Sequence, residues 1–288
     1  DFGGFNLYVA RAATKAGLPV LYYIPPQVWA HGPYRIKKIR KWVTKAAVIY
    51  PFEPELYRRY GTDAEYVGHP LFDEMGRVPP DEARTAAIRQ SLGGRIVALF
   101  PGSRRQEVKA NLPVMAEAAR RLQRDFPDLR FAAVCPRKVQ PLLAEIVEGA
   151  GVEVALPEAR AVTLARAAEL CITKSGTITL EIASQITPMV IFYRLNALIY
   201  FFAHGMATTS HIGLVNTLAG REICPERPMF RADAGWVARR AAGLLGDAEA
   251  YERCRSDIEE LLEDFAQPGA SARVARMALD MAGGRLAD

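Results

Sequence analysis

Cysteine is scarce in this sequence, and no two cysteines lie close together. The 288 residues include only four, with no C-x-x-C pair and no grouping with the four histidines. Closely spaced Cys and His residues indicate structural zinc sites, and cysteine pairs at short spacing indicate disulfide frameworks. The sequence therefore predicts neither a zinc site nor a disulfide-stabilised fold.

Long hydrophobic runs are also missing. The most notable apolar cluster, Ala197 to Ala203, has seven residues, whereas a membrane-spanning helix needs about 20. No charged segment followed by an apolar one opens the chain, so no secretory signal is predicted. We expect a cytoplasmic protein that does not span a membrane. Because the first residue is Asp1 rather than Met, we also expect that a segment is missing upstream.

The excess of positive charge is small. Thirty-seven Lys and Arg against 32 Asp and Glu give a net charge of +5. A nucleic-acid-binding domain concentrates its basic residues in a stripe or patch, and only residues 34–42 do so here. We therefore expect no nucleic-acid partner.

What the sequence does contain is a regular alternation of strand and helix patterns. The apolar runs Leu18–Ile24, Arg95–Phe100 and Leu170–Thr173 are typical of strands buried on both faces. Stretches with helical spacing, such as Asn111–Phe126, lie between such runs. This alternation predicts an α/β fold with parallel sheets. Turn-forming residues between Val78 and Gly94 indicate a domain boundary before the strand at Arg95.

The first candidate site is the turn Pro101–Glu107 (PGSRRQE), which follows a predicted buried strand. Ligands of open α/β sheets bind beyond the carboxyl ends of the strands. A glycine lets the backbone approach a ligand, a helix N-terminus favours an anion, and Arg104 or Arg105 could clamp a phosphate. The same pattern also suits an ordinary helix cap with solvated arginines.

The second candidate is the turn Ser175–Thr177, which opens a helix containing Glu181. Glu181 lies four residues beyond Thr177, so both fall on one face, where the carboxylate could bind a ribose diol. The turn is neither a Walker loop nor a G-x-G-x-x-G loop, and Ser or Thr is a routine helix cap. Two anion-binding turns in one domain would fit a nucleotide diphosphate.

A third polar stretch, Ser210–Glu222, places Asn216, Arg221 and Glu222 around glycines in an irregular segment. Such a segment is either functional or a surface loop with a chance charge pair. The sequence has no D-x-D pair of the kind that holds a divalent metal in many nucleotide-sugar enzymes. We therefore expect no metal and no cofactor, with arginine and helix N-termini neutralising a diphosphate.

Seven blocks together resemble the lipid-A-disaccharide synthase family, and they occur in the family's order. They are Asp1–Asn6 (DFGGFN), Tyr23–Ala30 (YIPPQVWA), Pro51–Glu55 (PFEPE), Val67–Pro70 (VGHP), Pro101–Glu107 (PGSRRQE), Ser175–Glu181 (SGTITLE) and Asn216–Glu222 (NTLAGRE).

The resemblance implies a GT-B glycosyltransferase, with two Rossmann-like domains facing a cleft. Residues 1–88 would be the C-terminal part of an incomplete, acceptor-side domain, residues 89–266 the UDP-sugar-binding domain, and residues 267–288 a helix returning to the first domain. The enzyme would transfer 2,3-diacylglucosamine from UDP-2,3-diacylglucosamine to 2,3-diacylglucosamine 1-phosphate, with inversion. The products would be the β-1,6 lipid A disaccharide and UDP.

The resemblance also implies roles for individual residues. Asp1 is the candidate general base for the acceptor hydroxyl. UDP and donor sugar would contact Gly102, Ser103, Arg104, Ser175, Gly176, Thr177, Glu181, Asn216, Arg221 and Glu222. We expect acceptor-side contacts from Asn6, Gln27, Trp29 and His69, although a lone histidine such as His69 is more often structural.

The chain departs from the family's pattern at several points. Gly4 stands where many members carry a second Asp, and Glu226–Phe230 (ERPMF) replaces a usual Glu-Leu-Leu-Gln ending. The family's opening strand and its Gly-Glu-x-Ser-Gly-Asp turn are absent, which leads us to expect a fragment. Two other hypotheses stay open: another GT-B enzyme, such as a UDP-N-acetylglucosamine 2-epimerase or other UDP-sugar transferase, or an inactive nucleotide-binding protein.

Two segments bear on membrane contact. Residues 34–42 carry five basic side chains separated by Ile36 and Ile39, and Ala197–Ala203 is apolar and aromatic. Each is typical of an ordinary helix, with a solvated face in the first case and a core face in the second. Because the implied substrates are acylated, either segment could instead contact an anionic lipid surface. We therefore weigh a peripheral position on the inner face of a Gram-negative inner membrane.

Overall fold

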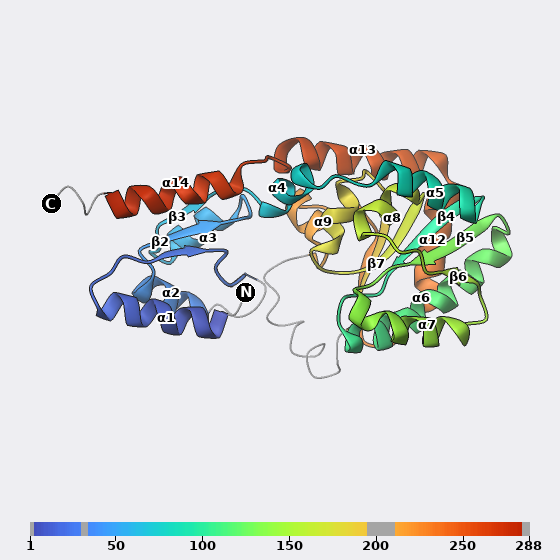
Figure 1. Cartoon of the computed structure of the whole chain (residues 1–288), viewed down its shortest axis with the longest axis horizontal. Coiled ribbons are helices and arrows are strands. Elements are labelled where there is room, and N and C mark those ends of the chain that lie inside the picture. Colours follow the sequence, from blue (N-terminus) through green and yellow to red (C-terminus); the bar gives the residue numbers. More distant parts are fainter. Residues whose placement is uncertain (1–2, 30–33, 195–210, 284–288) are drawn as a thin grey trace. The chain divides into compact units, whose positions relative to one another are not determined.

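The computed structural model describes residues 3–29, 34–194 and 211–283, and it contains two compact units (Figure 1). The first unit comprises the described residues up to Val78 and those from Glu263 onward. The second comprises the described residues from Pro79 to Leu262. Each contains a parallel sheet and helices, which confirms the predicted α/β class.

The first unit is built on a three-stranded sheet in the order β1-β2-β3. Its strands are parallel, with Leu21 opposite Lys45 and Ala46 opposite Ala64. Val48, Tyr57 and Ile39 are among the side chains that form its core. The elements are α1 (Gly3–Lys15), β1 (Leu21–Tyr23), α2 (Tyr34–Trp42), β2 (Lys45–Val48), α3 (Glu53–Arg59), β3 (Ala64–Tyr66), α4 (Pro70–Arg77) and α14 (Ala270–Gly283).

Helix α14 belongs to the first unit because polar contacts fix its beginning. The Asp73 carboxylate accepts backbone N–H bonds from Gly269 at 2.5 Å and Ser271 at 2.8 Å. Arg273 donates to the backbone carbonyl of Val67 at 2.7 Å. An added Cβ at Gly68, where φ is +84°, would lie 2.7 Å from the Arg273 guanidinium. Glycine at position 68 therefore leaves room for this contact.

The second unit has a six-stranded sheet in the order β6-β5-β4-β7-β8-β9, with every neighbouring pair parallel. Its elements are α5 (Glu82–Leu92), β4 (Arg95–Phe100), α6 (Arg105–Asp125), β5 (Leu129–Ala133), η1 (Arg137–Val139), α7 (Gln140–Glu148), β6 (Val154–Ala155), α8 (Ala161–Ala167), β7 (Leu170–Lys174), α9 (Ile178–Ala183), β8 (Met189–Arg194), α11 (Leu214–Ala219), β9 (Glu226–Met229), α12 (Ala234–Gly246) and α13 (Ala248–Phe265), whose residues from Glu263 onward belong to the first unit.

Helices cover both faces of this sheet. Val97, Ala98 and Leu99 are consecutive residues of β4, so they point to alternate faces, and all three are fully buried. Helix α6 packs with α7 and α12, while α8 packs with α5 and α9. The division between the units falls at Val78, before the predicted boundary at residue 88, because α5 packs against α8.

None of the helices in the described ranges is long and apolar enough to cross a membrane. Asp1, Ser210 and the segment Ala197–Ala203, which figured in the sequence predictions, lie outside the described residues.

Candidate functional site

The candidate site lies at the point in the second sheet where the order in which strands are added reverses. From β4 the chain adds β5 and β6 on one side, and from β7 it adds β8 and β9 on the other. Strands β4 and β7 are neighbours, with Phe100 opposite Thr173. The turns Pro101–Arg104 and Lys174–Thr177 therefore leave the same edge of the sheet side by side. Such a switch point is the usual ligand-binding place in an open α/β sheet.

The turn after β4 is closed by a carboxylate of the chain itself. Glu107 Oε2 accepts the backbone N–H of Ser103 at 2.9 Å and of Arg104 at 3.2 Å. Gly102 has φ +126°, and a Cβ there would lie 2.5 Å from the same oxygen. Glycine is therefore required for this close approach. The place predicted for a phosphate is filled here by the carboxylate of Glu107.

The charge state of Glu107 follows from its neighbours. Burial alone would raise the pKa of this carboxyl, but the charge of Lys174 and the N–H groups of Ser103 and Arg104 outweigh it and lower the pKa. The Arg104 guanidinium lies 3.4 Å from Glu107 Oε1, and its side chain is 83% exposed. Arg104 can therefore reach a ligand beside the turn.

The turn after β7 is tied to two other parts of the unit. Ser175 donates its backbone N–H to Phe192 at 2.9 Å and its hydroxyl to the carbonyl of Ile212 at 2.5 Å. Gly176 has φ +151°, a conformation that favours glycine. Thr177 is exposed at the start of α9, and Glu181 is half-buried in the same helix. Ser175 thus holds the third polar block beside this turn.

An ion pair joins the two turns, and neither partner was among the predicted site residues. Lys174 Nζ lies 3.3 Å from Glu107 Oε1, although the two residues are 67 positions apart. Both side chains are mostly buried, with 19% and 20% exposed. Glu107 belongs to the block Pro101–Glu107, and Lys174 directly precedes the turn Ser175–Thr177, but the sequence does not show that the two side chains meet.

The structure gives Asn216 a supporting place in the third block. Its side chain is completely buried. Asn216 Oδ1 accepts the backbone N–H of Ile223 and of Cys224, both at 2.9 Å, and its Nδ2 donates to the carbonyl of Cys224 at 2.8 Å. The amide therefore closes the turn between α11 and β9.

Arg221 pairs with helix α13, and Glu222 is exposed. The Arg221 guanidinium lies 2.9 Å from Asp257 and 3.2 Å from Glu260. The predicted residues of this block are thus divided: Asn216 points into the protein, Arg221 contacts a helix, and Glu222 faces solvent.

Glu226 is the first residue of the segment Glu226–Phe230, which departs from the family's pattern. Its side chain also forms hydrogen bonds with backbone groups. Its carboxylate accepts the N–H of Ile212 at 2.9 Å and of Gly213 at 2.7 Å, and lies 3.2 Å from His211 Nδ1. Glu226 therefore fixes the start of α11 next to the Ser175 contact. No sequence signal marked this role.

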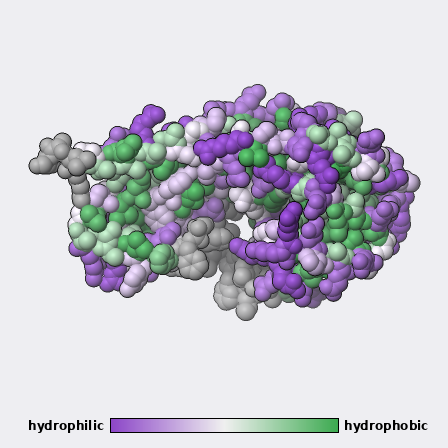
Figure 2. Space-filling view, viewed as in Figure 1, coloured by the Kyte–Doolittle hydropathy of each residue, from purple (hydrophilic) through white to green (hydrophobic). Residues whose placement is uncertain are grey.

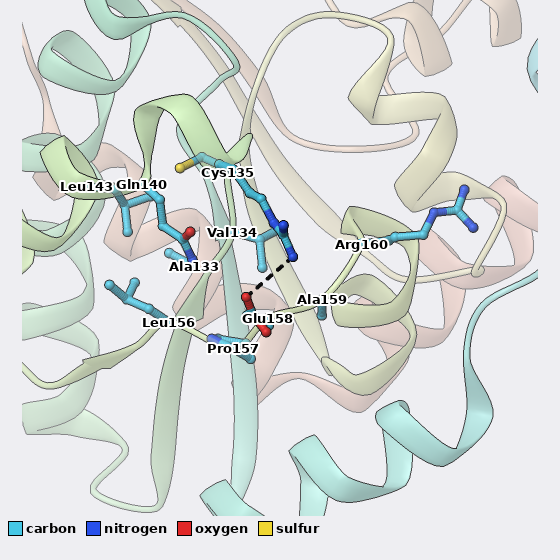
Figure 3. A pocket seen from close by; sticks show the side chains of 11 residues that line it. Ala133, Val134, Cys135, Gln140, Leu143, Leu156, Pro157, Glu158, Ala159 and Arg160 are labelled. Atoms are coloured by element: carbon cyan, nitrogen blue, oxygen red, sulfur yellow. Dashed lines mark ion pairs between the residues drawn. The ribbon is translucent and has the colours of Figure 1, made fainter.

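A pocket of about 340 Å³ lies at the carboxyl ends of β5 and β6 (Figure 3). Leu99 of β4 is opposite Ala133 of β5, so the pocket residues Ala133 and Val134 lie beside the turn that follows β4. Figure 3 shows its wall formed by the β5 to α7 connection and by the loop after β6. Arg137 and Glu158 form an exposed ion pair at 3.7 Å. The lining residues are Ala133, Val134, Cys135, Arg137, Gln140, Leu143, Leu156, Pro157, Glu158, Ala159 and Arg160.

In the first unit, two predicted acceptor-side residues, Trp29 and His69, belong to one aromatic cluster, which we define as Trp29, Tyr50, Phe52, His69, Phe72 and Phe265. Gln27 donates to the Tyr50 hydroxyl at 3.2 Å. His69 is 5% exposed, and burial lowers its pKa to about 4. Its Nδ1 accepts the N–H of Leu71 at 3.2 Å, so the ring is neutral and carries its proton on Nε2. Asn6 lies on α1 and is half-buried.

A buried carboxylate, Glu53, supports this aromatic cluster and was also missed. Its oxygens accept the Trp29 indole N–H at 3.0 Å and the backbone N–H of Ile49 and Tyr50 at 3.2 and 3.1 Å. Burial raises the pKa of Glu53 to about 7, although these bonds oppose the shift. Within the described ranges, no three His, Cys, Asp or Glu side chains gather into a group that could bind a metal ion.

Comparison with solved structures supports the fold. The chain resembles the S. aureus MnaA–UDP co-structure with a TM-score of 0.64 at 15% identity, covering 94% of this chain and 71% of that one. It also resembles UDP-GlcNAc 2-epimerase from Neisseria meningitidis bound to UDP-GlcNAc, with a TM-score of 0.66 at 11% identity, covering 95% and 73%. At these identities the likeness shows the fold alone, and it confirms the predicted GT-B class.

Comparison of sequences identifies the family. Residues 1–280 match the family described as Lipid-A-disaccharide synthetase. The lipid-A-disaccharide synthase of Geobacter sulfurreducens is 37% identical, covering 98% of this chain and 74% of that protein. The synthase of Trichlorobacter lovleyi is 38% identical with the same coverage. The sequence relatives therefore do not favour the epimerase alternative, and this chain belongs to the lipid-A-disaccharide synthase family.

Proposed function

We propose that this chain transfers 2,3-diacylglucosamine from UDP-2,3-diacylglucosamine to 2,3-diacylglucosamine 1-phosphate. The products are the β-1,6 lipid A disaccharide 1-phosphate and UDP. Family membership over residues 1–280 is the observation that carries the proposal. The switch point of the second sheet, where two glycine-bearing turns lie side by side, offers a place for the nucleotide.

The donor nucleotide would occupy the carboxyl edge of the second sheet. The pocket beside β5 and β6 has the volume for a nucleobase, and the Gln140 amide in its wall can both donate and accept hydrogen bonds. The turn after β4 lies next to it and carries the exposed Arg104 guanidinium. Glu181, on the helix that follows the β7 turn, would accept hydrogen bonds from the ribose.

The chemical step would be a single displacement with inversion. The acceptor hydroxyl attacks the anomeric carbon of the donor sugar as the bond to the UDP oxygen breaks. The electron pair leaves with the diphosphate, and a general base takes the hydroxyl proton. Asp1 is the candidate base from the sequence pattern. Arg104 and the turn that carries it would stabilise the negative charge that develops on UDP, without a metal ion.

Asn216 and Glu226 would act on this step through the backbone. Their hydrogen bonds fix both ends of α11, and the segment before that helix receives the Ser175 hydroxyl. We assign Asn216 the positioning of this block rather than direct donor contact. Arg221 and Glu222 remain the members of the block with exposed polar groups.

We further propose that the enzyme works in the cytoplasm, at the surface of the inner membrane. In α2, Ile36 and Ile39 are buried, whereas Lys37, Lys38, Arg40 and Lys41 are exposed. Helix α1, which packs against α2, exposes Phe5 and Tyr8. Figure 2 shows apolar and polar residues side by side over the part of the first unit that contains α1. Exposed aromatic and basic residues together favour contact with anionic lipid.

The test is to incubate the natural full-length protein with UDP-2,3-diacylglucosamine and 2,3-diacylglucosamine 1-phosphate and to follow disaccharide and UDP. We expect both products in equal amounts, a β linkage by NMR, and unchanged turnover after treatment with EDTA. UDP-N-acetylglucosamine in place of the acylated donor is the control, and it should not react. Turnover of that control without product from the acylated donor would contradict the proposal.

A further inference from the structure

Lys174 places a positive charge between the two turns of the switch point. Its Nζ lies 3.3 Å from Glu107 Oε1. Its side chain also folds over the following turn, because a Cβ added at Gly176 would lie 3.0 Å from Nζ. The ammonium is thus held between the glycine turn after β7 and the carboxylate that closes the glycine turn after β4.

The same geometry limits what the β4 turn can offer to a phosphate. The N–H groups of Ser103 and Arg104 already point at Glu107 Oε2. A diphosphate that approaches this turn therefore meets a carboxylate of its own sign, and like charges at such range repel. A nearby cation is needed to offset both the carboxylate and the ligand. In the described part of the chain, the cations paired with Glu107 are Lys174 and the exposed Arg104.

We propose that Lys174 binds the diphosphate of the nucleotide-sugar donor and that Glu107 positions its ammonium for this. An ammonium has three N–H donors, and one directed at Glu107 leaves two for phosphate oxygens. The ion pair holds the side chain between the turns before the ligand arrives, which reduces the entropy lost on binding. This inference rests on the proposed function, because it names a further residue of the same donor site.

The first experiment compares UDP with uridine, which lacks the phosphates, by calorimetry on the full protein. Lys174→Met should weaken UDP binding by about 10- to 100-fold, the usual effect of removing a hydrogen bond to a charged group. Uridine binding should stay within about twofold of the wild-type value. Lys174→Arg, which keeps the charge, should recover most of the UDP affinity. Lys45→Met is the matched control, because Lys45 forms a 2.8 Å ion pair with Glu65 on the first sheet.

The second experiment tests the role of Glu107 with a double-mutant cycle. In the wild-type background, Lys174→Met leaves the Glu107 carboxylate facing the diphosphate without its partner. In the Glu107→Gln background that repulsion is gone, so the same lysine substitution should reduce UDP affinity less. Equal losses in the two backgrounds would refute the positioning role.

The outcomes separate this inference from the proposed function. Wild-type protein that fails to bind UDP would overturn the proposed function itself. Wild-type protein that binds UDP, with Lys174→Met within twofold of it, would overturn only the role of Lys174. An equal loss of UDP and uridine affinity would also overturn it, because the lysine would then support the fold of the site rather than the phosphates.

Discussion

Trp29 and Glu53 are 24 residues apart, and the indole N–H of Trp29 donates to Glu53 Oε1 at 3.0 Å. The bond joins two of the blocks that carry the family resemblance, YIPPQVWA and PFEPE. The other carboxylate oxygen of Glu53 fixes the turn between β2 and α3 through two backbone N–H bonds. Both blocks therefore meet at one buried carboxylate, which places Trp29 against the ring of Tyr50.

The buried Glu53 predicts a pH-dependent loss of stability between about pH 5 and 8. Burial raises its pKa from 4.5 to about 7 in the folded protein. The folded state therefore binds more protons than the unfolded state in this range, and its stability falls as pH rises through 7, by at most about 3 kcal/mol. Glu53→Gln removes this titration. We expect the melting temperature of wild type to fall more than that of Glu53→Gln between pH 5 and 8.

The exposed Glu55 offers a control two residues away. It pairs with Arg59, and that hydrogen bond and charge lower its pKa, so it does not titrate in this window. Glu55→Gln should therefore keep the pH profile of wild type. Identical profiles for Glu53→Gln and wild type would contradict the role of Glu53.

Because His69 is buried, we expect the stability of the protein to depend on pH with the opposite sign at lower pH, falling as the pH falls. Burial lowers its pKa from 6.5 to about 4, so the unfolded state binds the proton first as pH falls. Stability contributed by the neutral ring is complete above pH 6.5 and is lost as pH falls toward 4. His69→Asn keeps an acceptor for the N–H of Leu71 but does not titrate. Its melting temperature should fall less than that of wild type between pH 6.5 and 4.5, and an equal fall would show that His69 is not the titrating group.

Asn216→Ala should destabilise the second unit. The substitution leaves two backbone N–H groups and one carbonyl of residues 223 and 224 without the partners they have in the structure. Each buried group left unsatisfied costs about 1 to 3 kcal/mol. We expect a clearly lower midpoint of urea unfolding, whereas Asn6→Ala, on the half-buried face of α1, should have a small effect. An unchanged midpoint with lost UDP binding would instead favour direct ligand contact.

Arg104→Ala should weaken UDP binding without lowering the stability of the protein. Because its side chain is 83% exposed, removing it should leave the melting temperature unchanged. Loss of a charge-assisted contact with phosphate should weaken UDP binding by about tenfold or more. Arg59→Ala, which removes an exposed arginine paired with Glu55, is the control. UDP affinity equal to wild type would remove Arg104 from the diphosphate site.

The sequence predicts the parts of this site that depend on local signals. Buried strands followed by glycine turns mark the edge of the sheet, and Gly102 and Gly176 are both found there with positive φ. The ion pair between Glu107 and Lys174 could not be predicted, because it depends on which strands are neighbours. Asn216 was expected to face a ligand, but its side chain is buried in the protein. The sequence of an irregular segment does not show whether its polar side chains point outward or inward. The pocket near Gln140 follows no motif, because its lining residues come from the segments after β5 and β6, which only the fold brings together.

Gly102→Ala tests whether the closed β4 turn is part of donor binding. A Cβ at this position would lie 2.5 Å from Glu107 Oε2, and alanine would have to adopt a φ of +126°. The turn must therefore open, or it keeps its conformation at a cost of about 1 to 3 kcal/mol of backbone strain. Either change displaces Glu107 and, with it, the partner of Lys174. We expect a lower melting temperature and weaker UDP binding. Gly243→Ala is the control, because no atom lies within 4 Å of its added Cβ and the helical position favours alanine. If Gly102→Ala bound UDP as tightly as this control, the carboxylate-closed turn would have no part in holding the donor.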